Sequence, residues 1–337
     1  RGCFVAMTLA LVSQSAGFVP TFCARRLPAC ASGRLHVCST AAVHTRMAVA
    51  AGGKSRLLKA IKKPLGTIAI MAEIKRRDPA TPDLEFPIPS IQELSQSLNT
   101  AKVQSIAVWT DYQEYGTSTD DLQQVVAAQQ KFKGNFPGPA PVLMLSKAVS
   151  CDDIKAAASA GAAGVLLSES LSAEELTAHV KACQHEGLEA VVVCRDNEHA
   201  QMALGAGAQV LALDTKFLGV DASIALSHCG QDAQVLIALG GIKTLEDAWK
   251  LRDAGFGCIV VGEEFLAAAY GRAGEVRQGG GKDGLNAAVC KGDTIRQNDL
   301  NTFIKALGAK ASVKFGPTGV NSFREMGANN KRHYVVE

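Results

Sequence analysis

Hydrophobic residues in the middle of the chain gather in eight short runs, separated by amphipathic stretches. The runs cover residues 67–72, 105–110, 141–145, 164–167, 190–193, 210–213, 235–239 and 258–261. Runs that are apolar at almost every position are typical of parallel strands buried on both faces. The intervening stretches, such as residues 173–185 and 244–254, have the apolar spacing of helices. Eight such units favour an α/β fold, a closed (βα)8 TIM barrel, over an open sheet.

The same pattern divides the chain into four parts. We expect a targeting leader over residues 1–48, an N-terminal helix over 49–65, the barrel over 66–272, and a linker with a C-terminal tail over 273–337. Residues 277–283 (RQGGGKD) are typical of a flexible linker, and residues 299–307 predict one helix. The polar residues 315–337 are either unstructured or a docking segment for a protein partner.

Charge is distributed unevenly along the chain. Residues 1–72 contain ten Lys and Arg and no Asp or Glu, which leaves a net charge of −7 on residues 73–337. This mildly acidic part excludes a typical nucleic-acid surface. A short apolar run and then an acid-free stretch rich in Ala, Arg and Ser indicate a signal-like segment plus a transit peptide. We therefore predict localisation to the plastid (chloroplast stroma) and no membrane attachment of the mature form. An N-terminal tail without a targeting role is the alternative.

Candidate chemistry appears where the first predicted strand ends. Glu73 and Lys75 are two residues apart, so both side chains point to the same side of an extended strand. The active sites of TIM barrels lie at the C-terminal ends of the strands. A carboxylate and an ammonium there can exchange protons and bind an anionic substrate. A structural ion pair that caps the barrel interior remains an equally simple interpretation.

Several motifs resemble one enzyme family when they are taken together. The first is AEIKR at residues 72–76, and the second is SIAVWTDYQEYGTSTDDL at residues 105–122, whose matching positions are Thr110, Asp111, Tyr115, Ser118, Asp121 and Leu122. The third is GGIKTLEDAWKLRDAGFGCIVVGEEFL at residues 240–266. These motifs are similar to those of indole-3-glycerol-phosphate synthase. The resemblance implies a barrel of the ribulose-phosphate-binding type that needs neither a cofactor nor a metal.

The resemblance also implies a reaction and a site. The family closes an indole ring from carboxyphenylamino-deoxyribulose phosphate, with loss of CO2 and water, in tryptophan biosynthesis. Glu73 and Lys75 match its catalytic pair, and Lys75 is also expected to hold an anionic group of the substrate. Its phosphate loops match Gly240 and Gly241 after the seventh strand and Gly262 and Glu263 after the eighth. Ordinary tight turns are the alternative explanation of these glycines.

Other family positions carry different residues in this chain. The general-acid Lys, one Glu and a second Glu correspond to Leu145, Val193 and Leu239, and an Asn and an Arg correspond to Asp214 and Lys216. Aliphatic side chains cannot transfer protons. We therefore expect Leu145, Val193 and Leu239 to pack into the barrel mouth instead of taking part in the reaction. Lys147 lies two residues after Leu145, on the same face, and is a candidate replacement acid; a solvated loop lysine is the alternative. We count Asp214 and Lys216 among the candidate catalytic residues.

Three functions are compatible with this sequence. The first is indole-3-glycerol-phosphate synthase activity on a phosphorylated, sugar-type small molecule. The second is a catalytically inactive barrel that serves as a binding or assembly partner in the plastid, with the C-terminal tail as a candidate contact for a protein partner. The third is a different phosphosugar enzyme on the same scaffold, which rests on fold analogy alone.

Overall fold

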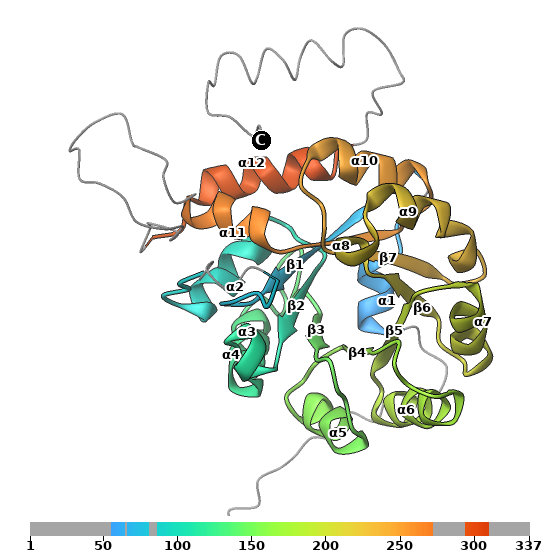
Figure 1. Ribbon diagram of the computed structural model, residues 1–337. Helices are drawn as coiled ribbons and strands as arrows, with labels where there is room; N and C mark the ends of the chain where they lie inside the picture. Colours follow the sequence, from blue (N-terminus) through green and yellow to red (C-terminus); the bar gives the residue numbers. More distant parts are fainter. Residues whose placement is uncertain (1–54, 65, 81–85, 272–293, 310–337) are drawn as a thin grey trace, which may run out of the picture. The chain divides into compact units, whose positions relative to one another are not determined.

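The computed structural model describes residues 55–64, 66–80, 86–271 and 294–309. Outside these ranges lie the predicted leader and part of the predicted N-terminal helix. The predicted linker and tail also lie outside them, except for residues 294–309. Figure 1 shows a ring of strands surrounded by helices. No helix within the described ranges is long and apolar enough to cross a membrane.

Eight parallel strands close into a barrel in sequence order. They are β1 (Ala69–Ile74), β2 (Ser105–Trp109), β3 (Val142–Leu145), β4 (Gly164–Leu167), β5 (Glu189–Cys194), β6 (Val210–Leu213), β7 (Val235–Leu239) and β8 (Cys258–Val261). Strand β1 pairs with both β2 and β8, for example Glu73 with Ala107 and Met71 with Val260, which closes the sheet. The predicted (βα)8 TIM barrel is therefore confirmed.

Each strand is followed by one or more helices, which cover the outside of the barrel. They are α2 (Ile91–Thr100), α3 (Tyr112–Tyr115), α4 (Thr119–Gln130), α5 (Cys151–Ser159), α6 (Ala173–Glu186), α7 (Asn197–Gly205), α8 (Thr215–Leu218), α9 (Val220–Ala225), α10 (Leu245–Asp253) and α11 (Glu263–Tyr270), with a 3-10 turn at Ser227–Gly230. Four of them, α4, α5, α6 and α10, begin with a capping box, in which the side chains of the first and fourth residues satisfy each other's backbone N–H groups. These local signals fix where the helices start.

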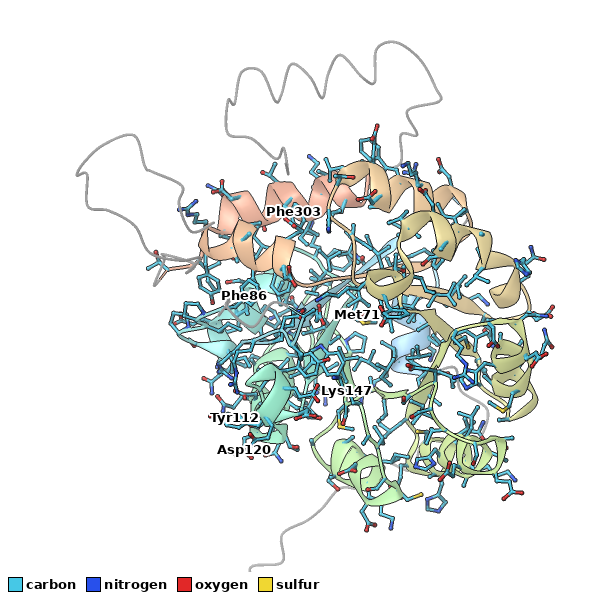
Figure 2. All side chains as sticks on the ribbon, viewed as in Figure 1. Met71, Phe86, Tyr112, Asp120, Lys147 and Phe303 are labelled. Atoms are coloured by element: carbon cyan, nitrogen blue, oxygen red, sulfur yellow. The ribbon has the colours of Figure 1, made fainter. Side chains whose placement is uncertain are left out.

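Alternate residues of each strand point into the barrel, where they form one apolar cluster, called the inner cluster below. Met71, Leu143, Val191, Ile237 and similar side chains fill it, and Met71 is labelled amid the strands in Figure 2. Helix α1 (Arg56–Ile61) adds three fully buried side chains to the same cluster: Leu57, Leu58 and Ile61. Helix α1 therefore contributes to the core inside the barrel.

A further helix, α12 (Gln297–Leu307), packs on the outside of the barrel against α2, α10 and α11. Leu300, Phe303, Ile304 and Leu307 join the outer apolar core, and Arg252 donates a hydrogen bond to the carbonyl of Ala309 at 2.6 Å. This helix lies within the sequence predicted as linker and tail. The packed unit therefore extends beyond residue 272, the boundary that the strand pattern predicts.

Candidate active site at the barrel mouth

Strand β1 carries Glu73 and Lys75 to the C-terminal end of the barrel, called the mouth below. Both residues are buried, with 8% and 3% of their surfaces exposed. The Lys75 Nζ lies 3.5 Å from a carboxylate oxygen of Glu73. The indole N–H of Trp109, at the end of β2, donates a hydrogen bond to the other Glu73 oxygen at 2.6 Å. Glu73 is thus fixed from two sides by side chains of neighbouring strands.

Two lysines from distant parts of the chain meet at one carboxylate. Lys75 and Lys216, from the first turn after β6, both donate to Oδ2 of Asp78. The Oδ1 of Asp78 accepts a hydrogen bond from the backbone N–H of Ala80 at 2.9 Å. Glu263 lies 3.6 Å from Lys75 Nζ and 3.4 Å from Lys216 Nζ. We call these five residues, Glu73, Lys75, Asp78, Lys216 and Glu263, the mouth cluster.

Burial and ion pairing act in opposite directions on the charges of this cluster. Burial alone would lower the pKa of Lys75, but Glu73, Asp78 and Glu263 outweigh it and raise that pKa. Burial alone would raise the pKa of Asp78, but its contacts with Lys216 and Lys75 hold that pKa well below its usual range. Both groups are therefore ionised at neutral pH. Lys75 is consequently better suited to binding negative charge than to giving up its proton.

The predicted site residue Asp214 has a local structural role. One oxygen of its carboxylate accepts a hydrogen bond from the backbone N–H of Phe217 at 3.0 Å and so caps α8. Burial raises the pKa of Asp214. The cap orients the short helix that carries Lys216 into the mouth cluster.

The glycines after β7 and β8 lie close to other parts of the protein. Gly241 has a φ of +70°, and a Cβ there would lie 2.7 Å from the carbonyl oxygen of Thr215. A Cβ at Gly262 would overlap the carboxylate of Glu73. Contacts within the protein thus already require glycine at both positions, and Gly240 has a φ of +67°. The first turn of α11 also carries Glu263 and Glu264, whose charges would repel a phosphate there. The phosphate-binding role of these loops remains a prediction.

Lys147 lies on the rim, outside the mouth cluster. Its side chain is 52% exposed and pairs with Glu114, and its Nζ lies 5.7 Å from the centre of the Tyr115 ring. Tyr115 stacks on Trp109 with a centroid distance of 3.7 Å. A chain of contacts through the rings of Tyr115 and Trp109 therefore connects Lys147 with Glu73. Figure 2 labels Lys147 and, on α3, Tyr112.

Aliphatic side chains occupy the inner positions where the sequence motifs predict lost acids and bases. Leu145 and Val193 are buried in the inner cluster, and Leu239 packs against it. The expectation that these residues fill the mouth is confirmed. At these three positions, on β3, β5 and β7, the wall of the mouth therefore offers no group that can transfer a proton.

Three contacts at the site, made by Asp78, Trp109 and Tyr115, are not among those that the sequence predicts. The ion pair between Asp78 and Lys75 has only a weak signal in the sequence, which is their spacing of three residues. Trp109 lies at an inward position of its strand, which strand parity could have indicated. The stacking of Tyr115 on Trp109 depends on the loop between β2 and α4, and its geometry has no signal in the sequence.

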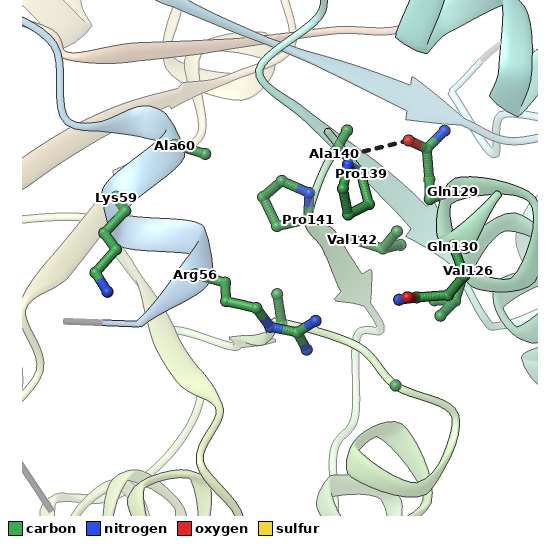
Figure 3. A pocket seen from close by; sticks show the side chains of 12 residues that line it. Arg56, Lys59, Ala60, Val126, Gln129, Gln130, Pro139, Ala140, Pro141 and Val142 are labelled. Carbon is green, nitrogen blue, oxygen red and sulfur yellow. Dashed lines mark hydrogen bonds between the residues drawn. The ribbon is translucent and has the colours of Figure 1, made fainter. Parts of the chain in front are cut away.

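A pocket of about 320 Å³ lies at the opposite end of the barrel, between α1, α4 and the start of β3. Figure 3 shows Arg56, Lys59 and Gln130 around it, together with the bond from the Ala140 N–H to Gln129. Within the described ranges, no group of three or more His, Cys, Asp or Glu is arranged to hold a metal.

Comparison with known proteins assigns the chain to a family. Indole-3-glycerol phosphate synthase of Opitutus terrae is 27% identical over 215 residues, covering 62% of this chain and 79% of the relative. Indole-3-glycerol phosphate synthase 2 of Streptomyces coelicolor is 27% identical over 246 residues, covering 70% of this chain and 90% of the relative. The family model of indole-3-glycerol phosphate synthase matches residues 31–274, more than half of the sequence. The chain therefore belongs to the indole-3-glycerol phosphate synthase family.

Proposed function

We propose that this protein catalyses the ring closure of carboxyphenylamino-deoxyribulose phosphate to indole-3-glycerol phosphate, at a low rate. The observation that carries the proposal is the buried Glu73–Lys75 pair at the end of β1. The pair lies where TIM-barrel enzymes hold their reacting groups. Membership of the family supports the reaction class.

The chemistry assigns different tasks to the two residues. The ring carbon that carries the substrate carboxylate attacks the sugar carbonyl, whose oxygen takes up a proton from solvent water to become a hydroxyl group. CO2 then leaves, and the bond electrons restore the aromatic ring. The hydroxyl group takes a second proton from solvent and departs as water. Lys75 stabilises negative charge on the substrate, because its raised pKa keeps it charged throughout. Glu73 accepts a proton when water is eliminated. Trp109 holds the Glu73 carboxylate in place for this step.

The proposed rate is low because aliphatic residues stand at three positions where the resemblance implies acids and bases. A positioned general acid or base contributes about 10²–10⁴-fold to a rate. Leu145, Val193 and Leu239 cannot act in this way, and Lys147 is paired with Glu114 on the rim. Lys147 would have to leave Glu114 and the face of the Tyr115 ring to act on a substrate beside Lys75.

The aliphatic inner wall also favours a second candidate function. A barrel that retains the mouth cluster but lacks the proton relay can bind a phosphorylated sugar-type ligand without converting it. Such a protein would act as a binding or assembly partner, with the C-terminal residues as a candidate docking segment.

Complementation of a tryptophan auxotroph that lacks this step separates the two functions. Growth with the unaltered chain that disappears with Lys75→Ala supports the enzyme. Growth that survives in Lys147→Ala excludes Lys147 as the replacement acid. Absence of growth, with calorimetric binding of a sugar phosphate by the purified chain, would favour the binding protein instead. Immunoblots of each strain exclude loss of the protein as the cause.

A further inference from the structure

Asp78 occupies a position that is built for an anion. Lys75 and Lys216 are 141 positions apart in sequence, yet both ammonium groups contact the same Asp78 oxygen. The Asp78 side chain is almost completely buried, and a backbone N–H holds its second oxygen. Two cations and an amide N–H around one carboxylate form the donor set that binds a carboxylate or phosphate ligand.

The charge balance of the mouth cluster means that the position of Asp78 affects the binding of an anionic ligand. The cluster contains two lysines and three carboxylates, so its formal charge is already negative before a ligand arrives. An incoming anion would meet Glu73 and Glu263 and would find both lysines already paired. It can gain their full attraction only if Asp78 leaves them, because like charges at a few ångströms repel strongly in a buried site.

We propose that Asp78 is an internal anion that fills the oxyanion site formed by Lys75 and Lys216, and that it competes there with the anionic groups of the ligand. This inference rests on the proposed binding of an anionic ligand at the mouth, but not on catalysis. It makes Asp78 a residue that sets affinity: ligands bind only if their oxyanion displaces the carboxylate. A purely structural ion pair would instead contribute to folding and leave ligand affinity unchanged.

Isothermal titration calorimetry with two probes tests the proposal on the full chain. The probes are inorganic phosphate and 2-aminobenzoate, which represent the two kinds of oxyanion that a family substrate carries. We expect Asp78→Asn to bind at least one of them about tenfold or more tightly than the unaltered chain. The probe whose affinity rises in the variant shows whether a phosphate or a carboxylate takes the place of Asp78. Equal affinities of variant and unaltered chain for both probes would overturn the proposal.

Glu263→Gln provides the matched control. It removes the same charge beside the same two lysines, but Glu263 lies at 3.6 and 3.4 Å from their Nζ atoms and is about one-third exposed. Solvent screens such a carboxylate, so we expect at most a few-fold gain. A gain equal to that of Asp78→Asn would show a general charge effect and contradict the occupancy of a site. In the double variant Asp78→Asn, Lys216→Gln the gain should disappear.

Thermal unfolding extends the test if Asp78→Asn is less stable. The probe that binds should raise the Tm of the variant more than that of the unaltered chain, with sodium chloride at equal ionic strength as the reference. A variant that stays unfolded with either probe contradicts the proposal, because a bound oxyanion would restore the missing negative charge.

Discussion

Glu73 shows how one residue can serve structure and chemistry together. Its carboxylate accepts a hydrogen bond from the Trp109 indole N–H, lies 3.5 Å from the Lys75 ammonium, and occupies the space that a Cβ at position 262 would need. Each contact limits its position, and together they fix one carboxylate at the mouth. A proton acceptor with so little freedom can react only with a substrate that is placed correctly.

Replacing Trp109 by Phe tests the fixing of Glu73. The change keeps an aromatic ring beside Tyr115 but removes the hydrogen bond to the carboxylate. A hydrogen bond to a charged group contributes about 1.5–3 kcal/mol, so we expect kcat/KM for ring closure to fall at least about tenfold. Tyr112→Phe changes an exposed ring on α3 and should leave the rate unchanged. Equal rates for Trp109→Phe and the unaltered protein would show that Glu73 needs no such support.

The ion pairs of Asp78 make stability depend on pH. The pKa of Asp78 in the folded protein lies below its ordinary value of 3.8. Its contribution to the free energy of unfolding is therefore complete only above about pH 5 and is lost as the pH falls toward the folded-state pKa.

Urea unfolding of Asp78→Asn at several pH values measures this contribution. Removing one partner of a buried ion pair costs about 3–5 kcal/mol, so we expect a loss near the lower end of that range at pH 7. The difference between the variant and the unaltered protein should shrink below pH 4. A difference that stays constant down to pH 3 would contradict ion pairing as its cause.

At the scale of elements, the predicted apolar runs match the strands closely, and the largest difference lies at β1. The apolar runs identify all eight strands because each is buried on both faces. The first run predicts residues 67–72, whereas β1 is Ala69–Ile74. The strand includes polar Glu73 because pairing with β2 and the contact with Trp109 stabilise it there. Such long-range contacts leave no trace in a local hydrophobic pattern.

Helix α1 offers a direct test of the inner core. Leu58 is fully buried in the inner cluster, whereas the next residue, Lys59, is exposed. Truncation of a buried leucine to alanine costs about 2–5 kcal/mol. We expect a loss of that size for Leu58→Ala, measured by urea unfolding, and a change below about 0.5 kcal/mol for Lys59→Ala. Similar small changes for both variants would mean that α1 is not part of the core.

At the scale of the whole molecule, α12 belongs with the barrel although the sequence separates them. Residues 272–293 lie between α11 and α12, and the strand pattern ends before them. The amphipathic character of residues 299–307 predicts a helix, but the surface that it covers is set by α2, α10 and α11. The same reason explains why Asp78 and Lys216 could not be paired from the sequence: the fold alone brings the ends of β1 and β6 together.

Truncation tests the role of α12. A chain that ends at residue 271 loses four buried apolar side chains, each worth about 1.5–3 kcal/mol of burial, and exposes their partners. We expect it to unfold or aggregate, whereas a chain that ends at residue 309 should keep the Tm of the full protein. Size-exclusion chromatography and thermal unfolding distinguish these results. A stable monomer ending at residue 271 would show that α12 is dispensable.

The most direct test of the account is the rate at which the purified protein forms indole-3-glycerol phosphate, followed by indole fluorescence, with and without Lys75→Ala. We predict a slow but measurable rate that falls at least about 10²-fold in the variant, because Lys75 is the buried cation of the mouth. A rate that is the same for both proteins would contradict the assignment of the mouth cluster as the active site.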